Sequence, residues 1–347
     1  MNIVSMKITV TARRGGYDES VHRVRAAVVD ARDVLLAATD DPQGPVFWRS
    51  TAKAFQALSM VRAGALERFG LGAEHLAVAC GSHSGAEEHV QVVGDLLQRI
   101  GATVEDLHCA PHTPIGEQEA RALRIAGQAP TRLHNNCSGK HAAMLATCRA
   151  RGWPLAGYHR LPHPLQVEIL DHMARVTDIP ADAIETAVDG CGAVVFRTPL
   201  VALARAFRRL AADQLPEPLQ EAGRRVRQAV QAAPRMVAGA NRLCTALVET
   251  TSGRLLGKVG GEGVYGLGVH GGGSAAAAFA LKVEDGGGRA VGPAVCALAR
   301  HLGWLSDEEL ERLRPFWEVP LWNHQKEHIG DLVVEVKDAT GLTRLPG

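Results

Sequence analysis

The chain has 347 residues, of which 46% are apolar, and its formal net charge at pH 7 is +1. A chain of this length buries about 75% of its unfolded surface, so a sizeable core is expected. The balanced charge excludes a strongly basic nucleic-acid binder, and the lack of an apolar run of about 18 residues excludes a membrane-spanning helix.

The beginning of the chain has no apolar stretch of the kind that forms a secretory signal. Its seven cysteines are an odd number, and a chain this long needs no disulfides to stabilise its fold. We therefore expect a cytoplasmic protein whose thiols are free, metal-bound or catalytic.

The first 47 residues favour strands, with apolar runs at 7–12, 24–30 and 33–39. Three helices are predicted next, each ended by a glycine, at Ser50–Phe69, Ser84–Ile100 and Ser138–Arg151. Ser50 is the predicted N-cap of the first, and Ser84 begins a capping box in the second. The apolar segment 75–80 between them is predicted to be a short buried strand.

Helical patterns continue at 159–176, 200–212 and 216–233. From residue 241 the pattern favours strands again, at 243–250, 253–260, 264–270 and 275–284. The chain is predicted to close with helices at 290–302 and 306–313 and a β-rich tail at 331–347.

These elements predict a mixed α+β fold, with a mainly antiparallel sheet flanked by helices and a helical subdomain. We expect one catalytic unit over 1–347, with a β-rich core from 1–50 and 240–347 and a mostly helical region over 50–235.

A Ser-x-x-Lys motif, Ser50 to Lys53, opens the first predicted helix. Residues three apart share a helix face, so the lysine amine can reach the serine hydroxyl and remove its proton. Taken alone, the same serine could simply cap its helix. The motif gains weight because Ser82 and later Lys258 follow in the order found in penicillin-recognising serine hydrolases.

A second group of residues suggests a metal site. Cys137 and Lys140 lie at the start of the third predicted helix, and Asp189 and Cys191 lie in a glycine-flanked turn. Two cysteines with a nearby Lys or His could bind Zn²⁺, with His141 as the competing ligand. The alternative is two buried free thiols. A G-x-G-x-x-G match at 266–271 comes too late in the chain for a dinucleotide site.

Seven segments together resemble the Rhizobium etli-type L-asparaginases, also called class 3, of the asparaginase II family. They are ESVHR (19–23), RSTAKAFQAL (49–58), CGSHSGAEEHV (80–90), NNCSGKHAAML (135–145), GYHRLPHPLQ (157–166), DGCGAVVF (189–196) and GKVGGEGVYG (257–266). The resemblance runs from about residue 7 to about residue 330.

The resemblance implies a fold similar to serine β-lactamases and glutaminases, a homodimer, and hydrolysis of the side-chain amide of L-asparagine. It implies Ser50 with Lys53 as one catalytic pair and Ser82 with Lys258 as the other. It also implies Zn²⁺ held by Cys137, Lys140 and Cys191 together with a water, and Cys244 near the site. Substrate contacts are expected from Arg49, His83 and Asp189.

The expected mechanism is attack by Ser50 with neutral Lys53 as base, while Ser82 and Lys258 pass the proton to ammonia. The sequence leaves open the converse, in which Ser82 is the nucleophile. It also leaves open a glutaminase or a β-lactamase-like serine hydrolase. A zinc-binding sensor without catalysis is disfavoured because both serines and both lysines are present.

Overall fold

The computed structural model describes residues 3–271, 277–339 and 341–345. The chain divides into two compact units. The first contains Met1–Thr51, Thr198–Ala212 and Ala246–Gly347, and the second contains Ala52–Arg197 and Asp213–Thr245.

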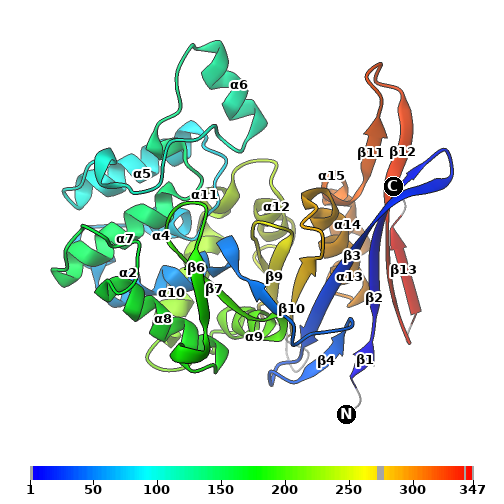
Figure 1. Cartoon of the computed structure of the whole chain (residues 1–347), viewed down its shortest axis with the longest axis horizontal. Coiled ribbons are helices and arrows are strands. Elements are labelled where there is room, and N and C mark those ends of the chain that lie inside the picture. The colour runs from blue at the N-terminus through cyan, green and yellow to red at the C-terminus, as the bar shows by residue number, and fades with distance from the viewer. Residues whose placement is uncertain (1–2, 272–276, 340, 346–347) are drawn as a thin grey trace. The chain divides into compact units, whose positions relative to one another are not determined.

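The first unit is built on a sheet with the strand order β11-β12-β2-β3-β10-β9-β8 (Figure 1). These strands are β2 (Lys7–Arg14), β3 (Tyr17–Val29), β8 (Leu255–Val259), β9 (Val264–Val269), β10 (Ala278–Val283), β11 (Val319–Trp322) and β12 (His328–Asp338). All neighbours along this order are antiparallel. In β2 the residues Ile8, Val10 and Ala12 are buried in alternation with less buried ones, as expected for a strand with one covered face.

Shorter strands extend this unit. β4 (Leu35–Ala38) pairs with β3, β1 (Val4–Ser5) pairs in parallel with β4, and β13 (Gly341–Leu345) pairs with β12. β5 (Pro45–Phe47) follows β4 in the chain.

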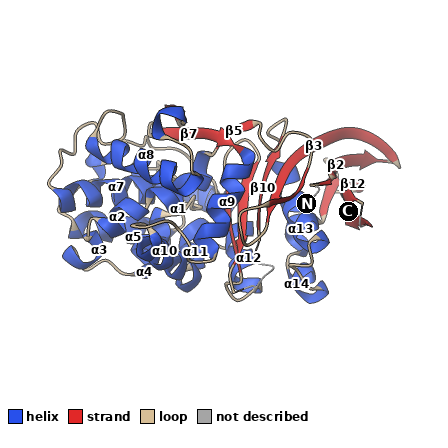
Figure 2. Ribbon diagram, turned by 90° about the horizontal axis from the view of Figure 1, so that it is seen from below, coloured by secondary structure: helices blue, strands red, loops and turns tan. Residues whose placement is uncertain are grey.

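Helices cover the sheet of the first unit (Figure 2). α13 (Val291–His301) packs on β2, β12 and β13, and α9 (Leu200–Ala211) packs on β3, β9 and β10. The α9 contact needs glycine on β9, because a Cβ on Gly266 would lie 2.4 Å from the Phe207 ring. α14 (Asp307–Arg312) and α15 (Arg314–Trp317) follow α13.

The second unit is mostly helical. Its helices are α1 (Lys53–Gln56), α2 (Leu58–Arg62), α3 (Ala65–Arg68), α4 (Ala73–Ala79), α5 (Glu87–Arg99), α6 (Glu117–Ile125), α7 (Ser138–Arg151), α8 (Pro164–Thr177), α10 (Gln220–Ala232) and α11 (Pro234–Ala238). α7 is buried from Ser138 to Cys148 and packs against α2, α4, α5 and α8. β6 (Glu185–Val188) pairs antiparallel with β7 (Val194–Pro199).

The mixed α+β class with a mainly antiparallel sheet flanked by helices is confirmed. The likeness to β-lactamases and glutaminases stays a prediction, as does the single catalytic unit over 1–347. Within the described residues, no helix has the length and apolar character needed to cross a membrane.

Two predicted strands are wrong. Residues 75–79 belong to α4, with Cys80 as its C-cap, and 243–250 form α12 (Leu243–Thr250). Both segments are short and apolar, and periodicity cannot separate a buried strand from a buried helix at that length. The strand predicted at 275–284 appears as β10, but its first two residues lie outside the described ranges.

Two predicted helices have different limits. The helix predicted at Ser50–Phe69 is divided into η1 (Arg49–Ala52), α1, α2 and α3, and Gly64 before α3 has a φ of +67°. Ser50 therefore lies inside a short 3₁₀ turn and does not cap an α-helix. α5 starts at Glu87, so Ser84 is not its N-cap and instead donates a hydrogen bond to Glu119.

Candidate active site

Lys53 lies at the start of α1 in the helical unit, and only 1% of it is exposed. Its Nζ donates hydrogen bonds to the Gly81 carbonyl oxygen at 2.5 Å and to the Asn136 carbonyl oxygen at 3.0 Å. Its third contact is with Ser82 Oγ at 3.1 Å. A buried lysine amine thus lies within proton-transfer distance of a serine hydroxyl, and two carbonyls orient it.

The loop between α4 and α5 carries Ser82. Its backbone N–H donates to the Val237 carbonyl at 2.8 Å, which ties the loop to α11. A side chain on the preceding Gly81 would meet the Met236 carbonyl at 2.7 Å. Glycine is therefore required here, since the backbone must approach α11 closely while offering its own carbonyl to Lys53.

His83 follows Ser82 and is fully buried. Its Nε2 lies 2.8 Å from Ser138 Oγ, which itself donates to the Leu133 carbonyl at 2.9 Å, so His83 is the donor to Ser138. Its ring stacks on His89 at a centroid distance of 4.8 Å. Burial, followed by the charges of His89 and Lys53, holds the pKa of His83 well below its usual value. The ring is therefore neutral near pH 7 and fixes the loop that carries Ser82.

A second buried lysine lies on α7 in the same unit. Lys140 Nζ is 2.9 Å from Cys191 Sγ, and Cys137 at the start of α7 is hydrogen-bonded to the same sulfur. Asp189 Oδ2 lies 3.6 Å from Cys191 Sγ. The cysteines and the lysine are all buried, so this group forms a compact set of two sulfurs, one nitrogen and a neighbouring carboxylate.

The electrostatics of this set favour a Cys191 thiolate. The hydrogen bond from Cys137 is the largest cause that lowers the pKa of Cys191 to about 5, and Lys140 adds to it against the effect of burial. The same hydrogen bond and burial raise the pKa of Cys137 to about 12. Burial opposes the charge on Lys140, but Cys191, Cys137 and Asp189 raise the pKa of this lysine above its ordinary value.

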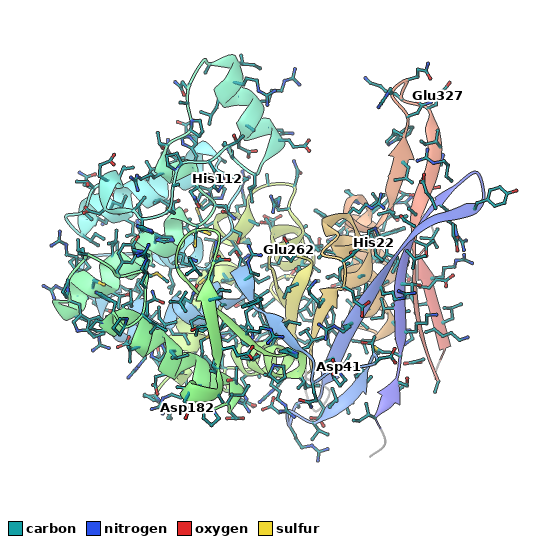
Figure 3. The ribbon with its side chains drawn as sticks, in the orientation of Figure 1. His22, Asp41, His112, Asp182, Glu262 and Glu327 are labelled. Atoms are coloured by element: carbon teal, nitrogen blue, oxygen red, sulfur yellow. The ribbon has the colours of Figure 1, made fainter. Side chains whose placement is uncertain are left out.

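Asn136 connects the two lysine groups along the chain. Its carbonyl oxygen accepts from Lys53, and the next residue is Cys137. His112, which is labelled in Figure 3, accepts at Nε2 a hydrogen bond from the backbone N–H of Asn136 at 3.2 Å. The positive charge of Lys53 also acts on the Cys137 thiol.

The sheet unit holds the other expected residues. Arg49 has a left-handed backbone with a φ of +48°, an unusual conformation for a side chain other than glycine, and such residues cluster at functional sites. Its guanidinium lies against Gly261, where an added Cβ would be 3.0 Å from Cζ. Lys258 on β8 is 4% exposed and donates to the Val259 carbonyl at 2.8 Å. Ser50 follows Arg49 and is half-buried.

The expected site residues thus divide between the units. The helical unit holds Lys53, Ser82, His83, Cys137, Lys140, Asp189 and Cys191, and the sheet unit holds Arg49, Ser50 and Lys258. The helical unit brings Lys53 together with Ser82, and Lys140 with both cysteines. Cys244 is buried in α12 and belongs to the helical unit. The pairings of Ser50 and Lys258 stay predictions.

Comparison with known protein families decides the assignment. The sequence model of L-asparaginase II matches residues 10–334, which is nearly the whole chain. The chain belongs to the L-asparaginase II family. No curated protein matches it. Membership in the L-asparaginase II family identifies a hydrolase that acts on amides and supports L-asparaginase activity.

The donor set on this asparaginase II chain fits the expected zinc. Across the described ranges, no cluster of three or more His, Cys, Asp or Glu side chains is arranged to hold a metal. The expected zinc ligands differ from such a cluster because the third of them is a lysine. Lys140 Nζ lies 2.9 Å from Cys191 Sγ. The two cysteine sulfurs match the ligand types that Zn²⁺ prefers. The lysine nitrogen can join them as a third donor once the thiols and the amine are deprotonated.

Several residues that contact the candidate active site could not be predicted from residue type. Gly81 and Asn136 act through backbone carbonyls, which carry no signature of residue type. His112 is a further contributor, because its Nε2 accepts a hydrogen bond from the Asn136 N–H. The long NNCSGKH segment at 135–141 was the available signal, since it contains Asn136 beside the expected zinc ligands.

Proposed function

We propose that this chain hydrolyses the side-chain amide of L-asparagine to L-aspartate and ammonia through a serine acyl-enzyme, as an L-asparaginase of the Rhizobium etli type. Membership in the asparaginase II family supports the substrate. The observation that carries the serine–lysine chemistry is the 3.1 Å contact between Lys53 Nζ and Ser82 Oγ inside a buried environment.

The roles of the four catalytic residues follow the order of their motifs. Ser50 Oγ attacks the amide carbon while Lys53 takes its proton. Ser82 and Lys258 deliver a proton to the leaving nitrogen, so the C–N bond breaks and ammonia departs. Water then attacks the resulting β-aspartyl ester, which releases aspartate and restores the serine. The Lys53–Ser82 contact equally supports the converse, in which Ser82 attacks.

Charged residues suit the two ends of the substrate. L-Asparagine carries an α-carboxylate and an α-ammonium group. Arg49 offers a guanidinium to the former, and Asp189 offers a carboxylate to the latter. His83 is assigned to the same substrate site, where its hydrogen bond to Ser138 would fix the loop that carries Ser82.

Zinc would be held by Cys137, Lys140 and Cys191, with Asp189 beside it. When bound, it would supply positive charge that helps to hold the substrate, while the serines and lysines carry out the reaction. We also propose a homodimer located in the cytoplasm, and a fold of the β-lactamase and glutaminase type.

Ammonia release from L-asparagine, with L-glutamine in parallel, tests this proposal. Ser50→Ala and Ser82→Ala should each lower kcat by about three orders of magnitude or more, because a missing nucleophile or relay has no substitute. Ser59→Ala is the matched control, since Ser59 is also buried in the helical unit and its hydroxyl is hydrogen-bonded to His172, which has no role in the proposed reaction. If both variants keep near-wild-type turnover, or if L-glutamine is the better substrate, the proposal is wrong.

A further inference from the structure

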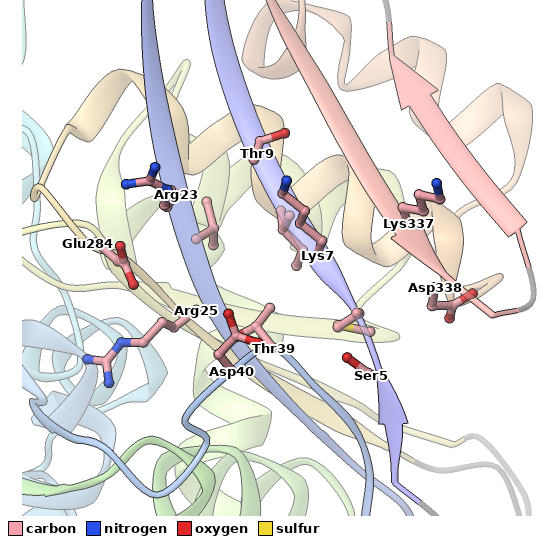
Figure 4. Close-up of a pocket in the computed structure, with 13 residues that line it drawn as sticks. Ser5, Lys7, Thr9, Arg23, Arg25, Thr39, Asp40, Glu284, Lys337 and Asp338 are labelled. Carbon is pink, nitrogen blue, oxygen red and sulfur yellow. The ribbon is translucent and has the colours of Figure 1, made fainter.

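A pocket lies within the sheet unit, on residues that have no place in the proposed reaction (Figure 4). Its volume is about 600 Å³, and strands β1, β2, β3 and β12 contribute its walls. Four of its lining residues are cationic: Lys7, Arg23, Arg25 and Lys337. Ser5 and Thr9 add hydroxyl groups that can donate hydrogen bonds.

The strand register places like charges directly opposite one another. Lys337 on β12 pairs with Lys7 on β2, and Arg25 on β3 pairs with Lys282 on β10. Ile8 pairs with Val24, so continuing that register by one residue puts Lys7 opposite Arg25. Four cations therefore form one row across four adjacent strands.

Such a row is unfavourable when it is not neutralised, because like charges directly opposite each other destabilise a sheet. Burial, followed by the charge of Arg25, lowers the pKa of Lys282, which is the sign expected for crowded cations. Neighbouring strands are about 4.8 Å apart, so the row extends over a distance that a single monovalent ion cannot cover.

Nearby carboxylates offset part of this charge, and Glu262, Asp285 and Glu284 act on Lys282. Asp338 is engaged by His301 at 2.9 Å, and Arg25 has Asp41 at 3.5 Å. Asp40 and Glu284 also line the pocket. Among the residues that the structure describes, Lys7, Arg23 and Lys337 form no ion pair with a carboxylate.

We propose that this pocket binds a small multivalent oxyanion, of the diphosphate or polycarboxylate class, between β2, β3 and β12. Arg23 and Arg25 can bind oxyanions through paired N–H donors, and Lys7 and Lys337 add mobile positive charges. The ligand takes the place of the counter-charge that the strand register lacks. The site is separate from the residues assigned to amide hydrolysis, so binding here is a further property of the protein.

Isothermal titration at low ionic strength tests this site with two probes, inorganic pyrophosphate and citrate. Wild-type protein should bind at least one of them, and the ratio of the two affinities distinguishes phosphate from carboxylate recognition. Lys7→Gln combined with Lys337→Gln should weaken that affinity tenfold or more. Lys326→Gln is the control, because it removes one exposed charge outside the pocket and should leave the affinity unchanged.

Thermal unfolding supplies an independent readout. In low-salt buffer without the anion, the double variant should melt at a temperature equal to or above that of wild type, because the repulsion between Lys7 and Lys337 is gone. Pyrophosphate or citrate should raise the melting temperature of wild type and not of the double variant. Three results would each overturn the proposal. Wild type could fail to bind either anion, Lys326→Gln could lose as much affinity as the double variant, or the double variant could keep the affinity of wild type.

Discussion

Two lysines are buried in the helical unit, and their surroundings differ in charge. Lys53 donates to two backbone carbonyls and a serine hydroxyl, which are all neutral. Lys140 contacts Cys191, whose pKa is lowered to about 5 first by the Cys137 hydrogen bond and then by Lys140. Because Lys53 contacts a serine hydroxyl and Lys140 contacts a cysteine sulfur, we propose proton transfer for Lys53 and metal binding for Lys140.

The largest effect expected from this comparison is that of Lys53→Met. Methionine fills a similar volume but cannot accept a proton from serine. We expect kcat for L-asparagine to fall by about 10²–10⁴, the usual contribution of a general base. Steady-state ammonia release measures this change. A kcat within a few-fold of wild type would remove Lys53 from the reaction.

Lys140→Met should act on a different kinetic constant. Because this lysine is proposed to hold zinc, its loss should raise KM about tenfold or more and change kcat less. The same variant should contain less zinc when the purified protein is analysed for metal, and a chelator should raise the KM of wild type in the same way. Unchanged zinc content together with unchanged KM would contradict the role of Lys140.

Gly81→Ala tests whether the backbone beside Lys53 is as tightly packed as the structure indicates. The new methyl group would meet the Met236 carbonyl at 2.7 Å, so the free energy of unfolding should fall by about 1–3 kcal/mol. Gly94→Ala is the matched control, because no atom lies within 4 Å of its added Cβ and alanine favours the helix α5. That control should raise the free energy of unfolding by up to about 1 kcal/mol, as measured by denaturant titration.

The smallest effect concerns acid stability. The pKa of His83 is held well below its ordinary value of 6.5, so below that pH the unfolded chain binds a proton that the folded protein does not. The free energy of unfolding should therefore fall as pH decreases below 6.5, with a slope of up to about 1.4 kcal/mol per pH unit from this histidine. His83→Gln should reduce that slope in denaturant titrations at several pH values. An identical pH dependence in the variant would show that His83 does not titrate in this way.

Sequence reasoning succeeded where local chemistry defines an element. The predicted limits of the helix Ser138–Arg151 match the observed ones. Its C-terminal limit is readable because Gly152 adopts the left-handed conformation that ends helices, with a φ of +70°. It failed at 75–80, where an apolar run suits a buried helix as well as a strand. The order of the motifs indicated both serines and both lysines, and the pairing of Ser50 with Lys53 stays a prediction. The contact of Lys53 with Ser82 depends on how α1, α4 and α7 pack, which no local pattern encodes.

Trapping of the acyl-enzyme tests the central claim most directly. Purified protein would be incubated with L-asparagine and increasing hydroxylamine, and the products separated. A β-aspartyl ester on serine reacts with hydroxylamine as well as water, so we predict β-aspartyl hydroxamate beside aspartate, in a ratio that rises with hydroxylamine. Aspartate as the only product at every hydroxylamine concentration, with ammonia released at the normal rate, would indicate direct attack by water and contradict the account.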